Sequence, residues 1–316
     1  MQAPSIAVVG EALIDLVPTS PTTYAARPGG GPANTAIALA RLGSSVTMLA
    51  RFGADSFGQL VREHLIGNGV DVEHAVRAEE PSSIAIVTRA TDGGASYRFL
   101  VDGTADWRWA ASELPSLPAA VAAVHSGSLA LALADSPALE SWLAAARSTA
   151  TLSIDPNLRP GLLPADAQGA VQRWLHIGDI VKVSVEDIAL IYPGVDPWET
   201  ARQWQKSGPA LVIVTAGADG ARAFFGDHEL AADAVKVSVV DTIGAGDAFT
   251  AGLLHALAAR GRLGGRLDHL DEADVGAALG YAVNVAALTC TRPGADPPTA
   301  TELSAGRATS RAVSRR

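Results

Sequence analysis

A short turn between a strand-like and a helix-like segment holds the residues with the clearest capacity for chemistry. The turn covers residues 241–247 (DTIGAGD), and the apolar face that follows predicts a helix that ends at Gly261. Small residues at 244–246 let a ligand approach the backbone, and N–H groups at a helix N-terminus favour an anion. Asp247 adds a carboxylate beside that anion site. This arrangement fits a group that orients a hydroxyl and accepts its proton during attack on a phosphoryl group. The alternative is a glycine-rich turn in which Asp247 is only a helix cap.

Three other polar segments follow strand-like runs. The glycines of residues 29–34 (GGGPAN) lead into a helix and would let a sugar-sized ligand touch the main chain. Arg159, in residues 155–160 (DPNLRP), could meet a phosphate beyond the carboxyl end of a parallel strand. Glu11 and Asp15 follow the first strand, and a carboxylate near Asp15 could accept two sugar hydroxyls. Each segment is also compatible with a plain loop, a surface arginine or a solvated acid.

Several other chemistries lack the motifs that they need. The chain has no GxxxxGK[ST] phosphate loop, no GxGxxG after its first strand and no HExxH zinc motif. The histidines are scattered, and His125 fits a core or loop position better than a ligand. Cys290 is the only cysteine, so no intrachain disulfide or thiolate zinc cage can form, which fits a reducing compartment.

The length and the apolar pattern indicate the elements that must position these residues. A chain of 316 residues, at roughly 150 per domain, predicts two domains or one large α/β domain with an appendage. Apolar residues make up 48% and charged residues 18%, which is enough for a full core. Apolar runs alternate with helical stretches, which predicts parallel βαβ units with helices on both faces of a sheet. The predicted strands are 6–9, 46–50, 152–154, 180–183, 211–215 and 235–240, and early helices are predicted over 34–42 and from a cap at Asp55 to about Ile66.

Two segments break this alternation. Strand-like runs at 84–88 and 97–101 flank Asp92-Gly93-Gly94, a hairpin turn signal, and residues 13–29 have three prolines and no helical period. Both segments follow early core strands, so we predict that residues 13–29 and 81–106 form a small β lid. The predicted α/β core then comprises residues 1–12, 30–80 and 107–305, and residues 306–316 are expected to be a flexible tail.

Charge and hydropathy limit the expected partners. The net charge is −9 and the pI about 5.2, so a diffuse negative surface would repel nucleic acid. The N-terminus has no basic region of the kind that opens a secretory signal. The longest apolar stretch, 275–290, is shorter than the ~20 residues of a membrane span. We therefore expect a cytoplasmic protein with no membrane partner.

The chain resembles the ribokinase-like sugar kinases, also called the phosphofructokinase B-type family. Residues 29–34, with Leu42-Gly43 and Gly53 downstream, are similar to the N-terminal signature of that family, and residues 241–247 are similar to its C-terminal signature. Residues 214–221 resemble its nucleotide loop, and residues 292–295 resemble its closing loop. The resemblance covers about residues 5–300. It implies an α/β fold with a central, mostly parallel sheet, helices on both faces and a small β-sheet lid.

The resemblance also assigns roles residue by residue. It implies an ATP-dependent kinase with Asp247 as catalytic base, beside an anion hole made by the N–H groups of Gly244, Ala245 and Gly246. The implied substrate-binding residues are Asp15, Gly30, Gly31, Asn34, Arg98 and Arg159. The implied ATP-binding residues are Lys182, Asp187, Thr215, Gly217, Gly220 and Asn284. Because a helix N-terminus stabilises a negative charge, we expect it to favour the ionised form of Asp247.

Two cations follow from the same resemblance. The family organises Mg²⁺ through water with an Asn/Ser-x-x-Glu element, which here reads Ser184-Val185-Glu186-Asp187, with Asp187 where glutamate is usual. A K⁺ ion would lie beside Asp241 and Ile243, held by carbonyl oxygens with help from the loop near Gly294. The expected cofactors are therefore ATP and Mg²⁺, and K⁺ is a further ion that the sequence alone does not establish.

Several substrates stay open within the family. Residues 10–15 (GEALID), 155–159 and 182–184 look like a fructokinase, which implies the conversion of D-fructose to fructose 6-phosphate. Arg98 and Arg159 could instead bind a sugar acid, as in a 2-keto-3-deoxygluconate kinase, and ribokinase is a further alternative. Tyr24, Tyr97 and Phe99 could stack on the base of a nucleoside. A catalytically silent sugar-binding protein is the alternative from another class, and we expect a homodimer paired through the lid.

Overall fold

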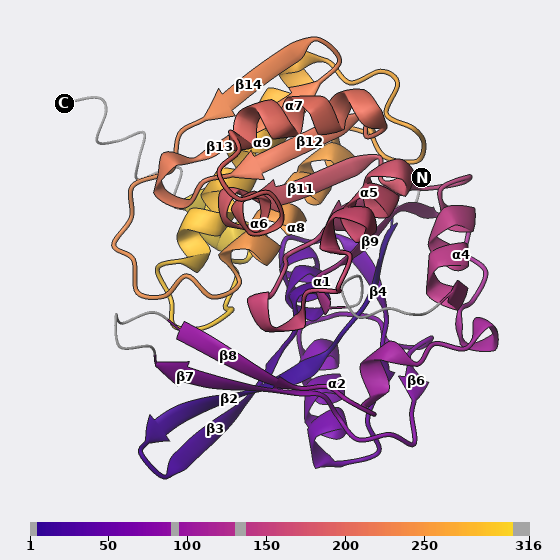
Figure 1. The fold of residues 1–316 in the computed structure, drawn as a ribbon, viewed down its shortest axis with the longest axis vertical. Coiled ribbons are helices and arrows are strands. Elements are labelled where there is room, and N and C mark those ends of the chain that lie inside the picture. The colour runs from indigo at the N-terminus through magenta and orange to yellow at the C-terminus, as the bar shows by residue number, and fades with distance from the viewer. Residues whose placement is uncertain (1–4, 90–94, 130–136, 306–316) are drawn as a thin grey trace.

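The structure, a computed structural model, describes residues 5–89, 95–129 and 137–305. Its main sheet consists, in spatial order, of β14 (His228–Ala232), β13 (Ala221–Phe225), β12 (Leu211–Thr215), β11 (Ile180–Ser184), β10 (Thr151–Asp155), β9 (Val121–Gly127), β1 (Ser5–Val9) and β4 (Ser45–Leu49) (Figure 1). The strands from β12 to β4 pair in parallel. The last two strands, β13 and β14, are antiparallel. The predicted mostly parallel sheet is confirmed.

Helices cover both faces of this sheet. One face carries α1 (Gly31–Arg41), α2 (Ser56–Gly67), α8 (Ala245–Ala259) and α9 (Glu272–Thr289), and the other carries α4 (Pro137–Ala146), α5 (Ala167–Ile177), α6 (Val185–Ile191) and α7 (Pro197–Ser207). Successive side chains of β1 alternate between the two layers. Ile6 and Val8 join the first apolar cluster, whereas Ala7 and Val9 join the second. This alternation is typical of a buried strand with both faces covered.

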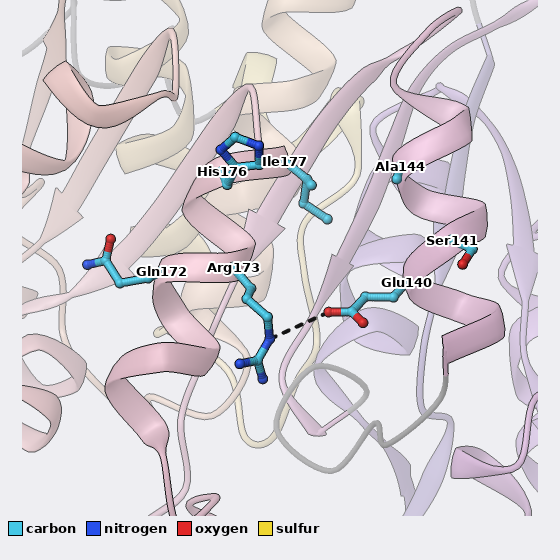
Figure 2. Close-up of a pocket in the computed structure, with 7 residues that line it drawn as sticks. All are labelled: Glu140, Ser141, Ala144, Gln172, Arg173, His176 and Ile177. Atoms are coloured by element: carbon cyan, nitrogen blue, oxygen red, sulfur yellow. Dashed lines mark ion pairs between the residues drawn. The ribbon is translucent and has the colours of Figure 1, made fainter.

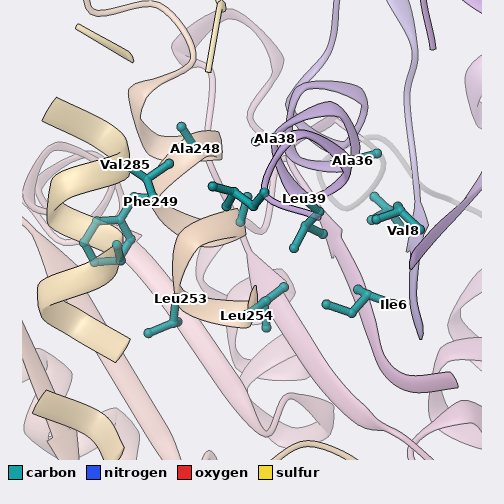
Figure 3. Packing of buried hydrophobic residues seen from close by; sticks show 14 of the residues in the cluster. Ile6, Val8, Ala36, Ala38, Leu39, Ala248, Phe249, Leu253, Leu254 and Val285 are labelled. Atoms are coloured by element: carbon teal, nitrogen blue, oxygen red, sulfur yellow. The ribbon is translucent and has the colours of Figure 1, made fainter. Parts of the chain in front are cut away.

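The packing of α8 fixes the start of the helix that carries Asp247. Phe249, Leu253 and Leu254 of α8 belong to one buried cluster with side chains of α1, β1 and α9, and Figure 3 shows Leu254 on the side of Leu39 and Ile6, and Phe249 on the side of Val285. On its other side α8 approaches α9 so closely that a Cβ atom added at Gly252 would lie 2.9 Å from a methyl group of Val285. Because interiors are close-packed, α8 has little freedom to rotate or slide.

A separate four-stranded sheet lies to one side of the main sheet (Figure 1). Its spatial order is β3 (Thr23–Gly29), β2 (Leu13–Ser20), β7 (Ile84–Arg89) and β8 (Ala95–Leu100). The strand-like runs predicted at 84–88 and 97–101 pair antiparallel as β7 and β8, while the turn at Asp92-Gly93-Gly94 lies outside the described residues. A short pair, β5 (Arg51–Phe52) and β6 (Val76–Arg77), completes the strands of the described residues. The division into core and lid at the stated boundaries stays a prediction, and the predicted tail at 306–316 also lies outside the described residues.

One predicted strand is wrong, and three strands of the main sheet were not predicted. Residues 233–239 form no regular structure, and Val239 and Val240 are more than half exposed. Instead of pairing with a strand, the N–H of Val240 donates to the carbonyl of Cys290 at the end of α9, at 2.8 Å. One end of the main sheet is formed by β13 and β14, and with β9 these are the strands of that sheet that the sequence pattern did not reveal. The short strands β5 and β6 were not predicted either. The helix predicted from residue 34 begins three residues earlier, at Gly31, because Pro32 is compatible with a first turn.

Within residues 5–89, 95–129 and 137–305, no helix combines the length and the apolar character needed to cross a membrane. The apolar stretch at 275–290 forms most of α9, which packs on α8.

The predicted N-cap of α2 provides a stability test. Asp55 accepts hydrogen bonds from the N–H groups of Phe57 and Gly58, and also from the N–H and hydroxyl of Ser82, at 2.8 and 2.6 Å. Asp196 caps α7 in the same way, through Trp198 and Glu199. We expect Asp196→Ala to lower the free energy of unfolding by about 1 kcal/mol, the usual cost of a lost cap. Asp55→Ala should cost about 1 kcal/mol more, because the bonds to Ser82 are lost as well. Urea denaturation measures both values, and equal losses would contradict the contribution of Ser82.

Candidate active site

A cavity of about 720 Å³ opens where three strands of the main sheet end. Glu11 follows β1, Ser128 follows β9, and Asn157 follows β10, and all three line the cavity. The small sheet contributes Leu13, Asp15, Tyr97 and Phe99 to the opposite wall. Ligands of open α/β sheets bind beyond the carboxyl ends of the strands, so this cavity is the candidate active site. Its other lining residues include Gly30, Gly31, Asn34, Arg159, Asp241, Thr242, Ile243, Gly244, Gly246 and Asp247.

The predicted turn leads directly into α8 at the cavity wall. Gly244 precedes the helix with a φ of 75°, a left-handed conformation that favours glycine. A Cβ atom there would lie 2.6 Å from the Cβ of Ala295, so the closing loop packs directly on the turn. Gly244 and Gly246 line the cavity, but Ala245 does not, and its N–H donates to the carbonyl of Thr242 at 3.2 Å. The small-residue turn is therefore at the cavity. Of the three N–H groups expected to form the anion hole, that of Ala245 already donates a hydrogen bond within the turn.

Asp247 lies in the first turn of α8 and is 8% exposed. The side-chain amide of Asn34 donates to its Oδ2 at 2.9 Å, and that of Asn157 donates to its Oδ1 at 3.4 Å. Burial raises the pKa of Asp247 to about 6, while the bond from Asn34 opposes the increase. Asp155 raises this pKa further, and Lys182 and Arg159 lower it. Desolvation of the carboxylate therefore outweighs the preference for the ionised form that we expected from the helix N-terminus.

The glycine segment and Asp15 form the wall that was predicted to hold the substrate. Gly30 has a φ of 108°, and a Cβ atom there would lie 2.7 Å from the carbonyl oxygen of Glu11. The N–H of Gly31 donates to Oε1 of Glu11 at 3.3 Å. A Cβ atom at Gly29 would lie 2.3 Å from Oδ2 of Asp15, so this carboxylate also needs a glycine beside it. Burial raises the pKa of Asp15 to about 6, Arg159 lowers it, and the charge of Asp247 raises it.

Arg98 does not reach this cavity. Tyr97 and Phe99 of β8 line it, and their rings stack at 6.0 Å between centroids. Successive side chains of a strand point to opposite faces, so Arg98 lies on the other face of the small sheet, where it is exposed. Arg98 is therefore absent from the cavity wall, and its contact with the substrate stays a prediction.

Lys182 lies beneath the turn rather than in the cavity wall. Its side chain is 4% exposed, and its Nζ donates to Oδ2 of Asp155 at 3.0 Å. A Cβ atom at Gly246 would lie 3.0 Å from Nζ. Nearby carboxylates raise the pKa of Lys182 against the opposing effect of burial, with Asp155 contributing most. The ammonium group is therefore a buried positive charge directly behind the start of α8.

Asp187 is turned inward and fits the expected magnesium role poorly. Its Oδ2 accepts hydrogen bonds from the N–H and hydroxyl of Ser184, and Ser184 caps α6. Its Oδ1 accepts from the N–H of Leu158 at 2.9 Å. The side chain is 6% exposed and does not line the cavity. Within the described part of the chain, no group of three His, Cys, Asp or Glu residues could hold a metal ion.

The other predicted nucleotide positions lie outside the cavity wall. Thr215 ends β12, next to Ser184 of β11, so it shares the sheet edge at which the cavity opens. Gly217 and Gly220 have positive φ values, and a Cβ atom at Gly220 would lie 2.1 Å from the carbonyl of Ala232. The amide of Asn284 donates to the carbonyl of Gly280 within α9, at 2.7 Å. These positions stay predicted nucleotide contacts.

Asp241 joins the two loops predicted for the monovalent cation. Its Oδ1 accepts from the N–H of Ile243 at 3.1 Å, and its Oδ2 accepts from the N–H of Gly294 at 2.8 Å. The three predicted positions therefore lie together. Because both carboxylate oxygens accept N–H groups, a cation here would rely mainly on carbonyl oxygens.

A second cavity, of about 540 Å³, lies between α4 and α5 (Figure 2). An ion pair between Arg173 and Glu140, at 3.6 Å, joins the two helices across it. Both of these side chains are largely exposed, and none of the predicted site residues lines this cavity. It is not the candidate active site.

Comparison with known proteins identifies the family. Residues 3–302 match the pfkB family of carbohydrate kinases. This chain belongs to that family. The ribokinase-like fold predicted from the sequence is confirmed, and the chain is a carbohydrate kinase, an enzyme that transfers a phosphoryl group.

Curated and solved relatives of this kinase cover most of its length. A fructokinase from Rhizobium leguminosarum is 35% identical over 257 residues, which cover 78% of each chain. An aminoimidazole riboside kinase from Salmonella typhimurium is 33% identical over 258 residues, which cover 79% of this chain and 80% of the relative. A crystal structure of a fructokinase double mutant from Vibrio cholerae, with fructose, ADP and potassium bound, matches with a TM-score of 0.83 at 28% identity. That match covers 96% of this chain and 98% of the other.

Asn157 is the main cavity residue to which the sequence analysis gave no role. It stands between Asp155 and Arg159 in a segment that was singled out for its arginine alone. A polar residue two positions beyond the end of a buried strand was the available signal, because such positions point toward the ligand edge of the sheet.

Substitution of Gly244 tests the contact between the turn and the closing loop. Gly261, just after α8, also has a positive φ, but a Cβ atom there would meet nothing within 4 Å. We expect Gly261→Ala to cost about 1 kcal/mol of stability, from the left-handed backbone alone, and to leave kinase activity unchanged. Gly244→Ala should cost more and should lower kcat by roughly tenfold or more, because Ala295 must move and the turn with it. Thermal unfolding and steady-state rates measure the pair, and equal behaviour of the two variants would rule out the predicted role of this contact.

The raised pKa of Asp247 predicts an acid limb in the pH profile. A base must be ionised, and this carboxyl takes up its proton as the pH falls through about 6. We therefore expect kcat/KM to be constant above this value and to fall by up to about tenfold per pH unit below it. Asp15, with a pKa also near 6, would make the limb steeper if its charge is needed as well. Initial rates across this range measure the limb, and a flat profile down to about pH 4.5 would contradict the assignment.

Proposed function

We propose that this kinase transfers the γ-phosphoryl group of ATP to a hydroxyl of D-fructose, giving fructose 6-phosphate. The observation that carries the proposal is the position of Asp247 in the cavity. Its buried carboxylate is held by Asn34 and Asn157, and it adjoins a small-residue turn at the start of α8. A phosphate at a helix N-terminus and a base for the attacking hydroxyl are the two groups that phosphoryl transfer needs side by side.

In this mechanism Asp247 acts as the base. The sugar hydroxyl donates its hydrogen bond to the carboxylate, and the proton passes to Asp247 as the oxygen attacks the γ-phosphorus. The bond to the leaving ADP oxygen breaks in the same step. Because the transition state is loose, positioning and charge neutralisation contribute most of the rate. The backbone at Gly244 and Gly246, with the ammonium of Lys182 behind it, supplies positive potential where negative charge develops.

The charge of the cavity favours a neutral sugar over a sugar acid. Among the described residues, the cavity lining includes Glu11, Asp15, Asp241 and Asp247 but a single cation, Arg159. Nη1 of Arg159 already donates to the side chain of Asn157 at 2.7 Å. A sugar acid would bring another carboxylate among these acids, which costs energy in a partly desolvated site. This argues against a 2-keto-3-deoxygluconate kinase, for which Arg98 would also be needed.

A riboside is the second candidate substrate. The stacked rings of Tyr97 and Phe99 line the cavity and could contact a heterocycle. The similarity to an aminoimidazole riboside kinase also supports this candidate. The identities to the two kinds of curated relative are close, at 35% and 33%, so a direct substrate comparison is required.

The nucleotide would bind as the MgATP complex along the predicted positions Thr215, Gly217, Gly220 and Asn284. Magnesium would arrive on the phosphate oxygens, and no step depends on Asp187, whose oxygens are already hydrogen-bonded. A monovalent cation beside Asp241 and Gly294 also belongs to the proposal. The potassium ion bound in the related fructokinase structure supports it.

The small sheet would act as a lid that excludes water after the sugar binds. Its edge strands are β3 and β8, and Tyr24 and Leu100 on these strands are each more than 40% exposed. Exposed edges of this kind can pair with a second copy, so we also propose a homodimer formed through the small sheet.

A substrate panel tests the proposed function. The purified protein is given MgATP and K⁺ with fructose, ribose, 2-keto-3-deoxygluconate or aminoimidazole riboside, and ADP release is measured. We expect fructose to give the highest kcat/KM and the sugar acid the lowest. A clear preference for the riboside would move the assignment to the second candidate, and sugar binding without turnover would favour a silent binding protein.

A variant of Asp247 serves as the control in the same assay. Asp247→Asn keeps the shape of the side chain but cannot accept a proton. We expect kcat to fall by a factor on the order of 10²–10⁴, with a much smaller change in fructose affinity. Activity within tenfold of the wild type would exclude Asp247 as the base.

A further inference from the structure

Asn157 has an unusual backbone for a residue with a side chain. Its φ is 40°, in the left-handed region, and within residues 5–89, 95–129 and 137–305 only two other non-glycine residues share a positive φ. Such conformations persist where the surroundings hold them, and they are enriched at functional sites. Asparagine tolerates this region better than most residues. The conformation itself suggests that the side chain of Asn157 is needed in one particular place.

The contacts of Asn157 fix which way its amide faces. Nη1 of Arg159 donates to the side-chain oxygen of Asn157 at 2.7 Å and to its main-chain carbonyl at 3.2 Å. Since a guanidinium group only donates, the amide oxygen must face Arg159. The amide nitrogen then faces Asp247, where it donates to Oδ1 at 3.4 Å. The positive charge of Arg159 polarises the amide and strengthens it as a donor.

The loop that carries Asn157 is itself anchored from below. The N–H of Leu158 donates to Oδ1 of Asp187 at 2.9 Å, and Asp187 is held in turn by Ser184. Two residues before Asn157, at the end of β10, the carbonyl oxygen of Asp155 accepts a hydrogen bond from the N–H of Ser128 at 2.9 Å. Bonds on both sides of Asn157 therefore prevent the loop from drifting relative to α8.

We propose that Asn157 is a positioning residue for the catalytic base, holding one oxygen of the Asp247 carboxylate while Asn34 holds the other. This inference rests on the proposed role of Asp247. Each carboxylate oxygen has more than one acceptor site, so two amides can fix the plane of the group and still leave an acceptor for the sugar hydroxyl. Asn157 acts through Asp247 and need not touch the reacting atoms.

The proposal predicts an effect on protonation that a purely structural role would not produce. The charged groups that face Asp247 are Asp155, Lys182 and Arg159, together with Asp15 across the cavity. A hydrogen bond donated to the ionised carboxylate lowers its pKa, so loss of the Asn157 amide should raise the pKa of Asp247. The acid limb of the pH profile should then move to higher pH.

Asn157→Gly is the decisive variant, because glycine keeps the positive φ without strain and removes only the amide. We expect a Tm equal to or above that of the wild type and a kcat lower by roughly tenfold, as for a lost hydrogen bond to a charged group. The KM for the sugar should change much less than kcat. The acid limb should move up by several tenths of a pH unit or more.

Asn157→Asp is the matched variant, because it keeps the size of the side chain and the acceptor for Arg159. It replaces the donor facing Asp247 with a carboxylate oxygen, so the acid limb should move further upward than in Asn157→Gly. This variant decides the question if Asn157→Gly has a lowered Tm. An unchanged limb in Asn157→Asp, or a change in KM alone, would overturn the proposal.

A measurement without substrate separates this inference from the proposed function. The Asp247 carboxyl can be titrated by carbon NMR in the wild type and in both variants, with Asp247→Asn assigning the signal. A higher pKa for Asp247 in both variants supports the contact even if no tested sugar is phosphorylated. Identical titrations, with an active wild type, would overturn the role of Asn157 and leave the kinase assignment intact.

Discussion

The structure depends on keeping a carboxylate buried, charged and beside the start of a helix. Burial favours the neutral form of Asp247, and its raised pKa of about 6 reflects that desolvation. The amide of Asn34 and the nearby cations Lys182 and Arg159 oppose this effect. The result is a base that is ionised at neutral pH yet more basic than an aspartate in water. This property suits the uptake of a proton from an attacking hydroxyl.

The fold brings these groups together because parallel strands end at a common edge. Asn34 lies in the first turns of α1, Asn157 follows β10, and Asp247 opens α8, although more than 200 residues of chain separate the first from the last. Close packing of α8 against α1 and α9 sets the position of the helix start (Figure 3). The precision of the site therefore comes from the core, and the loops carry only the final side chains.

The sequence predicts those parts of the site that depend on local chemistry. A turn of small residues before an apolar helix, and an aspartate that caps α2, are local patterns, and the structure contains both. Arg98 shows the limit of this reasoning. It lies on the face of β8 opposite to Tyr97 and Phe99, which both line the cavity, and the strand pattern does not record which face of the small sheet turns toward the cavity. The strand predicted at 235–240 is wrong for a related reason. A strand needs a neighbouring strand to pair with, and here the N–H of Val240 instead donates to a carbonyl at the end of α9. The role of Asn157 depends on a contact across 90 residues of chain, which no local pattern records.

The same electrostatic constraint explains why Lys182 is buried. An ionised base beside a polyphosphate is a repulsive arrangement, and Asp155 and Asp187 add two further carboxylates behind it. The ammonium of Lys182 lies among these acids and directly beneath Gly246. Its single positive charge therefore opposes both the repulsion among the carboxylates and the repulsion between the base and the phosphate. Burial makes this charge effective, because water screens it less there than at the surface. A lysine in the cavity itself would be screened and mobile. Its position under the helix start instead provides a fixed potential to which both the base and the phosphate respond.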